Sequence, residues 1–126
     1  MAMATGQLTM QIIQRDGLCE HAAAMGDRLR KKLLAIDSDC IGEVRGRGLM
    51  MGVEIVNGTK RNKMGHPEHG GERAVRIQTE ALKRGLIIER GGRQGCVLRF
   101  LPALIINEAE IDFIADVIRR AIHATA

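Results

Sequence analysis

The chain has 126 residues, enough for one domain with a modest core, and its 45% hydrophobic and 27% charged residues are ordinary for a globular protein. No segment is long and apolar enough to span a bilayer, so we expect no membrane among its partners. The net charge of +4 is spread along the chain, and two phenylalanines stand without any tyrosine or tryptophan, which argues against nucleic-acid binding by aromatic stacking.

Two helices are expected in the first third of the chain. Residues 2–14 carry the apolar pairs Leu8/Ile12 and Met10/Ile13 at helical spacing, with no capping residue before them. This uncapped start leads us to expect a chain cut from a longer protein. After a polar break, a second helix carries one apolar stripe, formed by Leu18, Ala22, Met25, Leu29, Leu33 and Ile36.

The middle of the chain predicts two strands, over residues 41–47 and 49–56. Because side chains alternate along a strand, one face of the second strand is apolar and carries Leu49, Met51, Val53 and Ile55. Residues 57–71 are polar and rich in glycine, asparagine and histidine, and they predict a loop.

The last third predicts a helix over residues 72–84 that ends at a glycine, followed by short strands over 86–89 and 96–101. Asn107 and Glu110 have the spacing of a capping box, and they precede a final helix. The apolar face of that helix consists of Ile111, Ile114, Ala115, Ile118 and Ile122. The order α-α-β-β-α-β-β-α predicts an α+β fold, with a small, mostly antiparallel sheet of about four strands and helices packed on one face.

Arg99 is the residue with the clearest chemical implication, because it lies inside the apolar run 96–101. In a strand it shares a face with Val97 and Leu101, whereas Cys96 points to the opposite face. An arginine cannot lose its proton and is costly to bury alone, so it requires an anion, and its planar fork suits a carboxylate. The alternatives are an internal ion pair with Glu54 or Glu89, or an exposed position at a sheet edge.

Other chemical signals are weak. His66 and His69 could bind a metal, but Pro67 between them favours a surface loop, and we expect no metal site. The segment 46–52 has the spacing G-x-G-x-x-x-G and precedes a strand, so it predicts a structural turn rather than a dinucleotide site. None of the five lysines has the apolar setting of a Schiff-base lysine.

The three cysteines stand far apart and show no Cys-x-x-Cys spacing. The pattern indicates neither a zinc site nor a disulfide framework, so we expect reduced thiols and a cytoplasmic location. Cys96 is not expected to be activated by Arg99, because the two side chains point to opposite faces of the predicted strand.

Three stretches together resemble the class III pyridoxal-phosphate-dependent aminotransferases. Residues 41–54 resemble the family's V-R-G-x-G-L-M-x-G-x-E segment, residues 84–88 its later G-L-I strand, and residues 97–106 its V-x-R-F-x-P-x-L-I-I run. Residues 89–95 look most like the diaminobutyrate–2-oxoglutarate aminotransferase branch.

The resemblance implies that residues 1–126 are the C-terminal small domain of a fold-type I aminotransferase. Residues 1–36 would form the connecting and N-terminal helices, and residues 41–126 an α/β sandwich. The resemblance implies that Arg99 grips the α-carboxylate of an amino acid or 2-oxo acid, with diaminobutyrate and glutamate/2-oxoglutarate as substrates. No residue matches the family's catalytic or cofactor-binding positions.

The resemblance also implies partners for this domain. Pyridoxal phosphate would be held by the large domain of the parent enzyme, and we expect none bound to this chain, which would then be inactive alone. A homodimer or higher homo-oligomer is expected, because surface that packs on the large domain would otherwise be exposed. The alternative is a freestanding α+β module that binds an anionic small ligand or assembles with itself.

Overall fold

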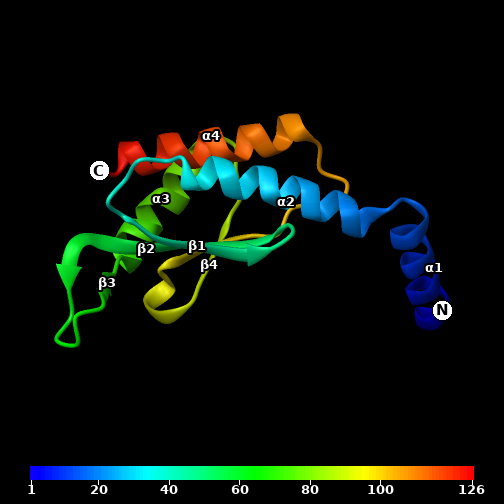
Figure 1. Cartoon of the computed structure of the whole chain (residues 1–126), viewed down its shortest axis with the longest axis horizontal. Coiled ribbons are helices and arrows are strands. Elements are labelled where there is room, and N and C mark those ends of the chain that lie inside the picture. Colours follow the sequence, from blue (N-terminus) through cyan, green and yellow to red (C-terminus); the bar gives the residue numbers. More distant parts are fainter.

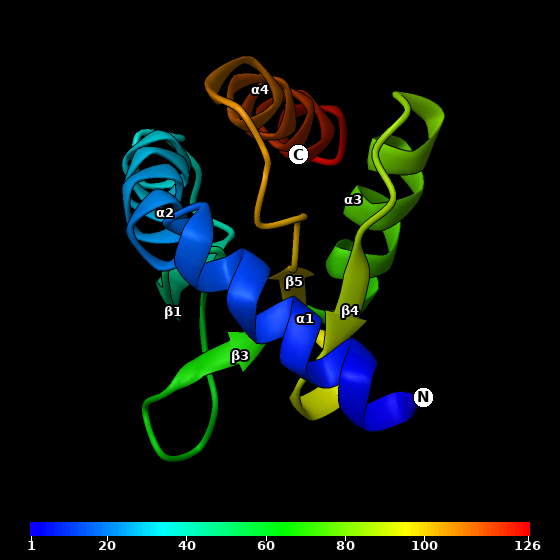
Figure 2. The ribbon, with the colours of Figure 1, turned by 90° about the vertical axis from the view of Figure 1, so that its right-hand side faces the viewer.

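Helices cover one face of a small sheet, and the other face is open (Figures 1 and 2). The computed structural model describes all 126 residues. The helices are α1 (Ala2–Arg15), α2 (Leu18–Leu34), α3 (Gly71–Lys83) and α4 (Glu108–Ala124). The strands are β1 (Ile41–Arg47), β2 (Met50–Arg61), β3 (Pro67–His69), β4 (Glu89–Gly91) and β5 (Val97–Phe100). No helix is both long enough and apolar enough to cross a membrane.

The sheet is antiparallel throughout, with the strand order β1-β2-β5-β4, and β3 pairs with the far end of β2. In its central register, Gly52 of β2 lies between Arg45 of β1 and Arg99 of β5. Two residues further along β2, Glu54 lies opposite Val97. The side chains of Arg45, Arg99, Glu54 and Val97 face away from the helices. The residues that alternate with them on β2 and β5 point the other way and are buried in the core.

The core lies between this sheet and helices α2, α3 and α4. The expected stripe of α2 and the expected faces of β2 and α4 supply most of its buried residues. The capping box at the start of α4 is present, because Asn107 and Glu110 each bond the other's backbone N–H at 2.9 Å. The predicted α+β fold and the order of its main elements are confirmed.

The predicted loop over residues 57–71 is wrong in part, because β2 continues to Arg61 and β3 makes a fifth strand. The hairpin is closed by polar groups: the Asn62 side chain accepts bonds from the backbone N–H groups of Met64 and His66. Its polar composition therefore reflects an exposed hairpin rather than irregular chain.

The strand predicted over residues 86–89 is also displaced, and β4 begins only at Glu89. The backbone groups before it bond to α3 instead of to β5: the Leu86 N–H donates to the Ala81 carbonyl at 3.0 Å, and the Gln78 side chain donates to the Ile88 carbonyl at 2.7 Å. These apolar residues consequently line a hollow beside the sheet.

Helix α1 stands apart from the other three helices (Figure 1). None of its residues is buried, although Leu8 and Met10 are among its apolar side chains. The expected helix is present, but Leu8 and Met10 face solvent in this chain, whereas Ile12 and Ile13 are half-buried.

Candidate functional site

Arg99 lies on the open face of the sheet, near its centre. Its side chain crosses β4 at Gly91, where an added Cβ would lie 2.8 Å from the Arg99 Cδ. A residue with a side chain at that position would push Arg99 away, so the glycine leaves the room that the arginine side chain occupies. The Arg99 side chain is 49% exposed, because no element of this chain covers the open face.

The partner of Arg99 within the chain is Glu89, one of the two carboxylates considered from the sequence. Its Oε2 lies 3.7 Å from the Arg99 Nη1, and the Glu89 side chain is 68% exposed. Such a long, solvent-exposed ion pair contributes little free energy. It also leaves most of the guanidinium fork free to bind another carboxylate.

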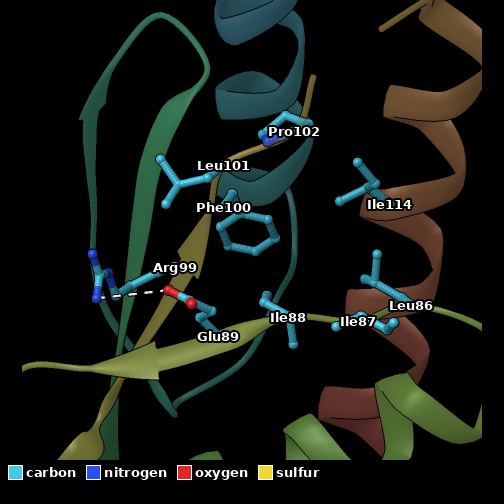
Figure 3. A pocket seen from close by; sticks show the side chains of 9 residues that line it. All are labelled: Leu86, Ile87, Ile88, Glu89, Arg99, Phe100, Leu101, Pro102 and Ile114. Atoms are coloured by element: carbon cyan, nitrogen blue, oxygen red, sulfur yellow. Dashed lines mark ion pairs between the residues drawn. The ribbon is translucent and has the colours of Figure 1, made fainter. Parts of the chain in front are cut away.

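An apolar hollow of about 350 Å³ begins beside Arg99 and Glu89 (Figure 3). The figure shows the two charged side chains together at one end and Leu86 and Ile87 at the other. The other lining residues are Ile88, Phe100, Leu101, Pro102 and Ile114. This arrangement can hold a small acid, with its carboxylate at the arginine and its carbon chain against apolar side chains.

A second hollow of about 280 Å³ also borders Arg99, and Arg45 and Met50 are among its lining residues. The Arg45 Nη1 already donates to Glu43 and to Glu54, each at 2.7 Å. Hydrogen bonds from Arg45 to Glu54 and Glu43 raise the Arg45 pKa. The expected alternative of a Glu54–Arg99 ion pair is therefore wrong, because Glu54 is occupied by Arg45.

His66 and His69, which were considered as a metal-binding pair, lie in different surroundings. His66 lies in the exposed hairpin turn, whereas the Nδ1 of His69 lies 3.5 Å from the Cys96 sulfur and 3.6 Å from Glu54 Oε1. Cys96 was expected on the face opposite Arg99, but its backbone is helical (φ −85°, ψ −4°) and it precedes β5. Its thiol consequently lies near Glu54, whose carboxylate is on the open face.

Cys96 is buried, and burial followed by the charge of Glu54 raises the pKa of its thiol. The grouping of Glu54, His69 and Cys96 was missed from the sequence because the three residues lie on β2, on β3 and before β5. Their separation along the chain has no recognisable spacing, and only the strand pairing brings them together.

The comparison with known proteins decides the family. Residues 1–122 match the family model described as "Aminotransferase class-III". The chain belongs to the class III aminotransferases. Members of this family use pyridoxal phosphate.

Two relatives are diaminobutyrate–2-oxoglutarate aminotransferases. The chain is 48% identical to the enzyme of Rhizobium meliloti over 124 residues, which cover 96% of this chain and 26% of that protein. It is 39% identical to the enzyme of Haemophilus influenzae over 115 residues, covering 89% of this chain and 25% of that protein. The chain thus spans about a quarter of the length of these relatives.

Solved structures agree with this assignment. A thermostable omega transaminase from Pseudomonas jessenii superposes with a TM-score of 0.76 at 33% identity, covering 92% of this chain and 25% of that chain. Another structure of the P. jessenii omega transaminase is a complex with PMP. A phospholyase from Arthrobacter has a TM-score of 0.84 at 24% identity, over 96% of this chain and 28% of that chain, which shows the shared fold.

The residues of this chain do not by themselves fit a complete pyridoxal phosphate site. Enzymes of this chemistry hold the cofactor as a Schiff base on a lysine. No lysine lines either hollow beside Arg99. The lysines of the chain are Lys31, Lys32, Lys60, Lys63 and Lys83.

Proposed function

We propose that this chain is the C-terminal small domain of an aminotransferase that exchanges an amino group between L-2,4-diaminobutyrate and glutamate/2-oxoglutarate. In this proposal Arg99 binds the substrate α-carboxylate. The observation that carries the proposal is the position of Arg99, which lies on the open face of the sheet, is weakly paired, and borders the apolar hollow beside the sheet. The 48% and 39% identity to diaminobutyrate aminotransferases supports the choice of substrate.

A single carboxylate clamp suits the reaction, because the amino donor and the 2-oxo acceptor bind in turn and both carry an α-carboxylate. A bidentate guanidinium–carboxylate pair fixes the orientation of the bound acid as well as its position. Glu89 would be displaced toward solvent by the incoming acid, since its own pair with Arg99 is long and exposed.

The cofactor and its lysine would then belong to a large partner domain that covers the open face. When bound there, pyridoxal phosphate supplies the electron sink for the chemistry at the substrate amino group. The exposed apolar side chains of α1 support a further contact with that domain or with a second copy. Without this partner, the chain would not catalyse transamination.

A chimeric enzyme tests the proposal. The corresponding quarter of the R. meliloti relative is exchanged for this chain, and transamination of L-2,4-diaminobutyrate with 2-oxoglutarate is measured. The chimera should be active, whereas the chain alone with pyridoxal phosphate should not be. Arg99→Gln should lower kcat/KM about 100-fold for both acids, since loss of a charge-assisted pair removes about 3 kcal/mol of binding.

The matched control is Arg61→Gln, which removes an exposed arginine at the end of β2 and should leave kcat/KM unchanged. A correctly folded chimera that binds cofactor but has no activity would contradict the assigned reaction. An active chimera in which Arg99→Gln changes kcat/KM less than about threefold would contradict the carboxylate role alone.

A further inference from the structure

We propose that Glu54, His69 and Cys96 form a binding site for a single zinc ion. The site is separate from the Arg99 hollow and does not depend on the proposed function. The three donor atoms, one from each side chain, lie within 4.8 Å of one another. They come from β2, from β3 and from the residue before β5, so an ion there would fasten the β2–β3 hairpin to the start of β5.

Two of the three distances between donor atoms match those of a tetrahedral zinc centre, and the third is below 4.8 Å. Bonds of about 2.0–2.3 Å to nitrogen, oxygen and sulfur place neighbouring ligand atoms about 3.3–3.6 Å apart. The structure has 3.5 Å between Cys96 Sγ and His69 Nδ1, and 3.6 Å between His69 Nδ1 and Glu54 Oε1. An ion could therefore bind with only small side-chain movements.

The geometry favours an ion over a nucleophilic cysteine. In a Cys–His–acid catalytic set, the thiol and the carboxylate contact opposite nitrogens of the imidazole. Here Cys96 and Glu54 both face the same nitrogen, Nδ1 of His69. The sulfur, the carboxylate oxygen and this nitrogen thus lie close enough together to contact one ion, as the ligands of a metal do.

Arg45 acts as an outer partner that orients the carboxylate. Its Nη1 bonds Glu54 Oε2 at 2.7 Å and leaves Oε1 directed at His69. Hydrogen-bonded partners of this kind hold metal ligands in place. The positive charge of Arg45 is also shared with Glu43, at 2.7 Å, so the guanidinium faces two carboxylates.

Burial and access both suit a bound ion. Cys96 is 1% exposed, whereas the side chains of His69 and Glu54 are 28% and 24% exposed. His69 also lines an open polar hollow of about 570 Å³, together with Glu68 and Glu72. Of the three proposed ligands only His69 lines this hollow, so a cation that enters there would reach the site past His69.

The ligand types select the metal. Thiolate, imidazole and carboxylate together suit zinc, whereas magnesium and calcium prefer sites made of oxygen alone. Binding replaces the thiol proton of Cys96 with the metal, and that proton passes to the buffer. Because the three ligands link separate strands, zinc should raise the thermal midpoint of the chain as its concentration increases.

Cobalt(II) titration of the metal-free chain tests the site, because a cobalt–thiolate bond gives a charge-transfer band in the near ultraviolet. We expect one cobalt per chain, with the band abolished by excess zinc. Cys96→Ser should eliminate the band, and His69→Gln should weaken binding about 100-fold or more, since even an outer partner is worth about 10–100-fold.

The matched controls are Cys19→Ser, which removes an exposed thiol, and His66→Gln, which removes the neighbouring histidine. Both should keep the band and the affinity of the unaltered chain. Absence of the band in the unaltered chain, or its survival in Cys96→Ser, would overturn the proposal. If Cys96→Ser does not fold, His69→Gln gives the same decision, because that side chain is partly exposed.

Discussion

Replacing Gly26 by alanine should destabilise the fold, although alanine is the better helix former. Gly26 lies on α2 against the β1–β2 turn, and an added Cβ would be 2.1 Å from the Gly48 carbonyl oxygen and 2.3 Å from its carbon. Both atoms belong to the backbone, so helix and turn must move apart. The gain in helix propensity is about 1 kcal/mol, whereas overpacking costs up to about 3 kcal/mol.

The net effect is a loss of about 2 kcal/mol in the free energy of unfolding, or about 8 °C in Tm for a domain of this size. Urea denaturation followed by circular dichroism measures this loss. An unchanged m-value would show that the variant and the unaltered chain expose the same amount of surface on unfolding. Gly6→Ala in α1 is the control, because an added Cβ there meets nothing within 4 Å. A Gly26→Ala chain as stable as the unaltered one would refute this account of the helix–turn contact.

Three further changes test other contacts. Asn107→Ala should lower the free energy of unfolding by about 1 kcal/mol in urea denaturation, since it removes the α4 cap. Hydrogen bonds from Arg28 lower the pKa of Asp112 from 3.8 to about 2; stability from this carboxylate is therefore complete above pH 4 and falls toward pH 2, and Asp112→Asn should flatten that part of an acid titration. Glu89→Gln should lower the KM of the chimera for carboxylic acids by up to about fivefold, because a competing surface pair of up to about 1 kcal/mol is lost; a higher KM would contradict the displacement of Glu89.

Local patterns were sufficient to predict the helices and the start of α4. The capping box depends on Asn107 and Glu110, which are three residues apart, and the apolar stripes depend on helical periodicity alone. The strand over residues 86–89 was misplaced because its apolar run resembles a strand, while its backbone bonding is decided by Gln78 on α3. A contact between elements cannot be deduced from the periodicity of either one.

At the candidate sites, too, the sequence predicted local features but not contacts between elements. Arg99 could be singled out because a charge within an apolar strand is unusual, and its possible partner Glu89 was among the alternatives considered. Its half-exposed position could not be predicted, since that depends on the open face of the sheet. Cys96 was placed on the wrong face, because its helical backbone breaks the alternation that the strand was expected to have.

The distribution of carboxylates favours Arg99 over Arg45 for the proposed binding of a substrate carboxylate. The two lie in one row on either side of Gly52, at the border of the same hollow. Arg45 is bonded to Glu43 and Glu54 at 2.7 Å each, whereas Arg99 has Glu89 at 3.7 Å. An incoming acid would have to displace two short pairs at Arg45 but only one long, exposed pair at Arg99, so the proposed binding at Arg99 would lose fewer existing contacts than binding at Arg45.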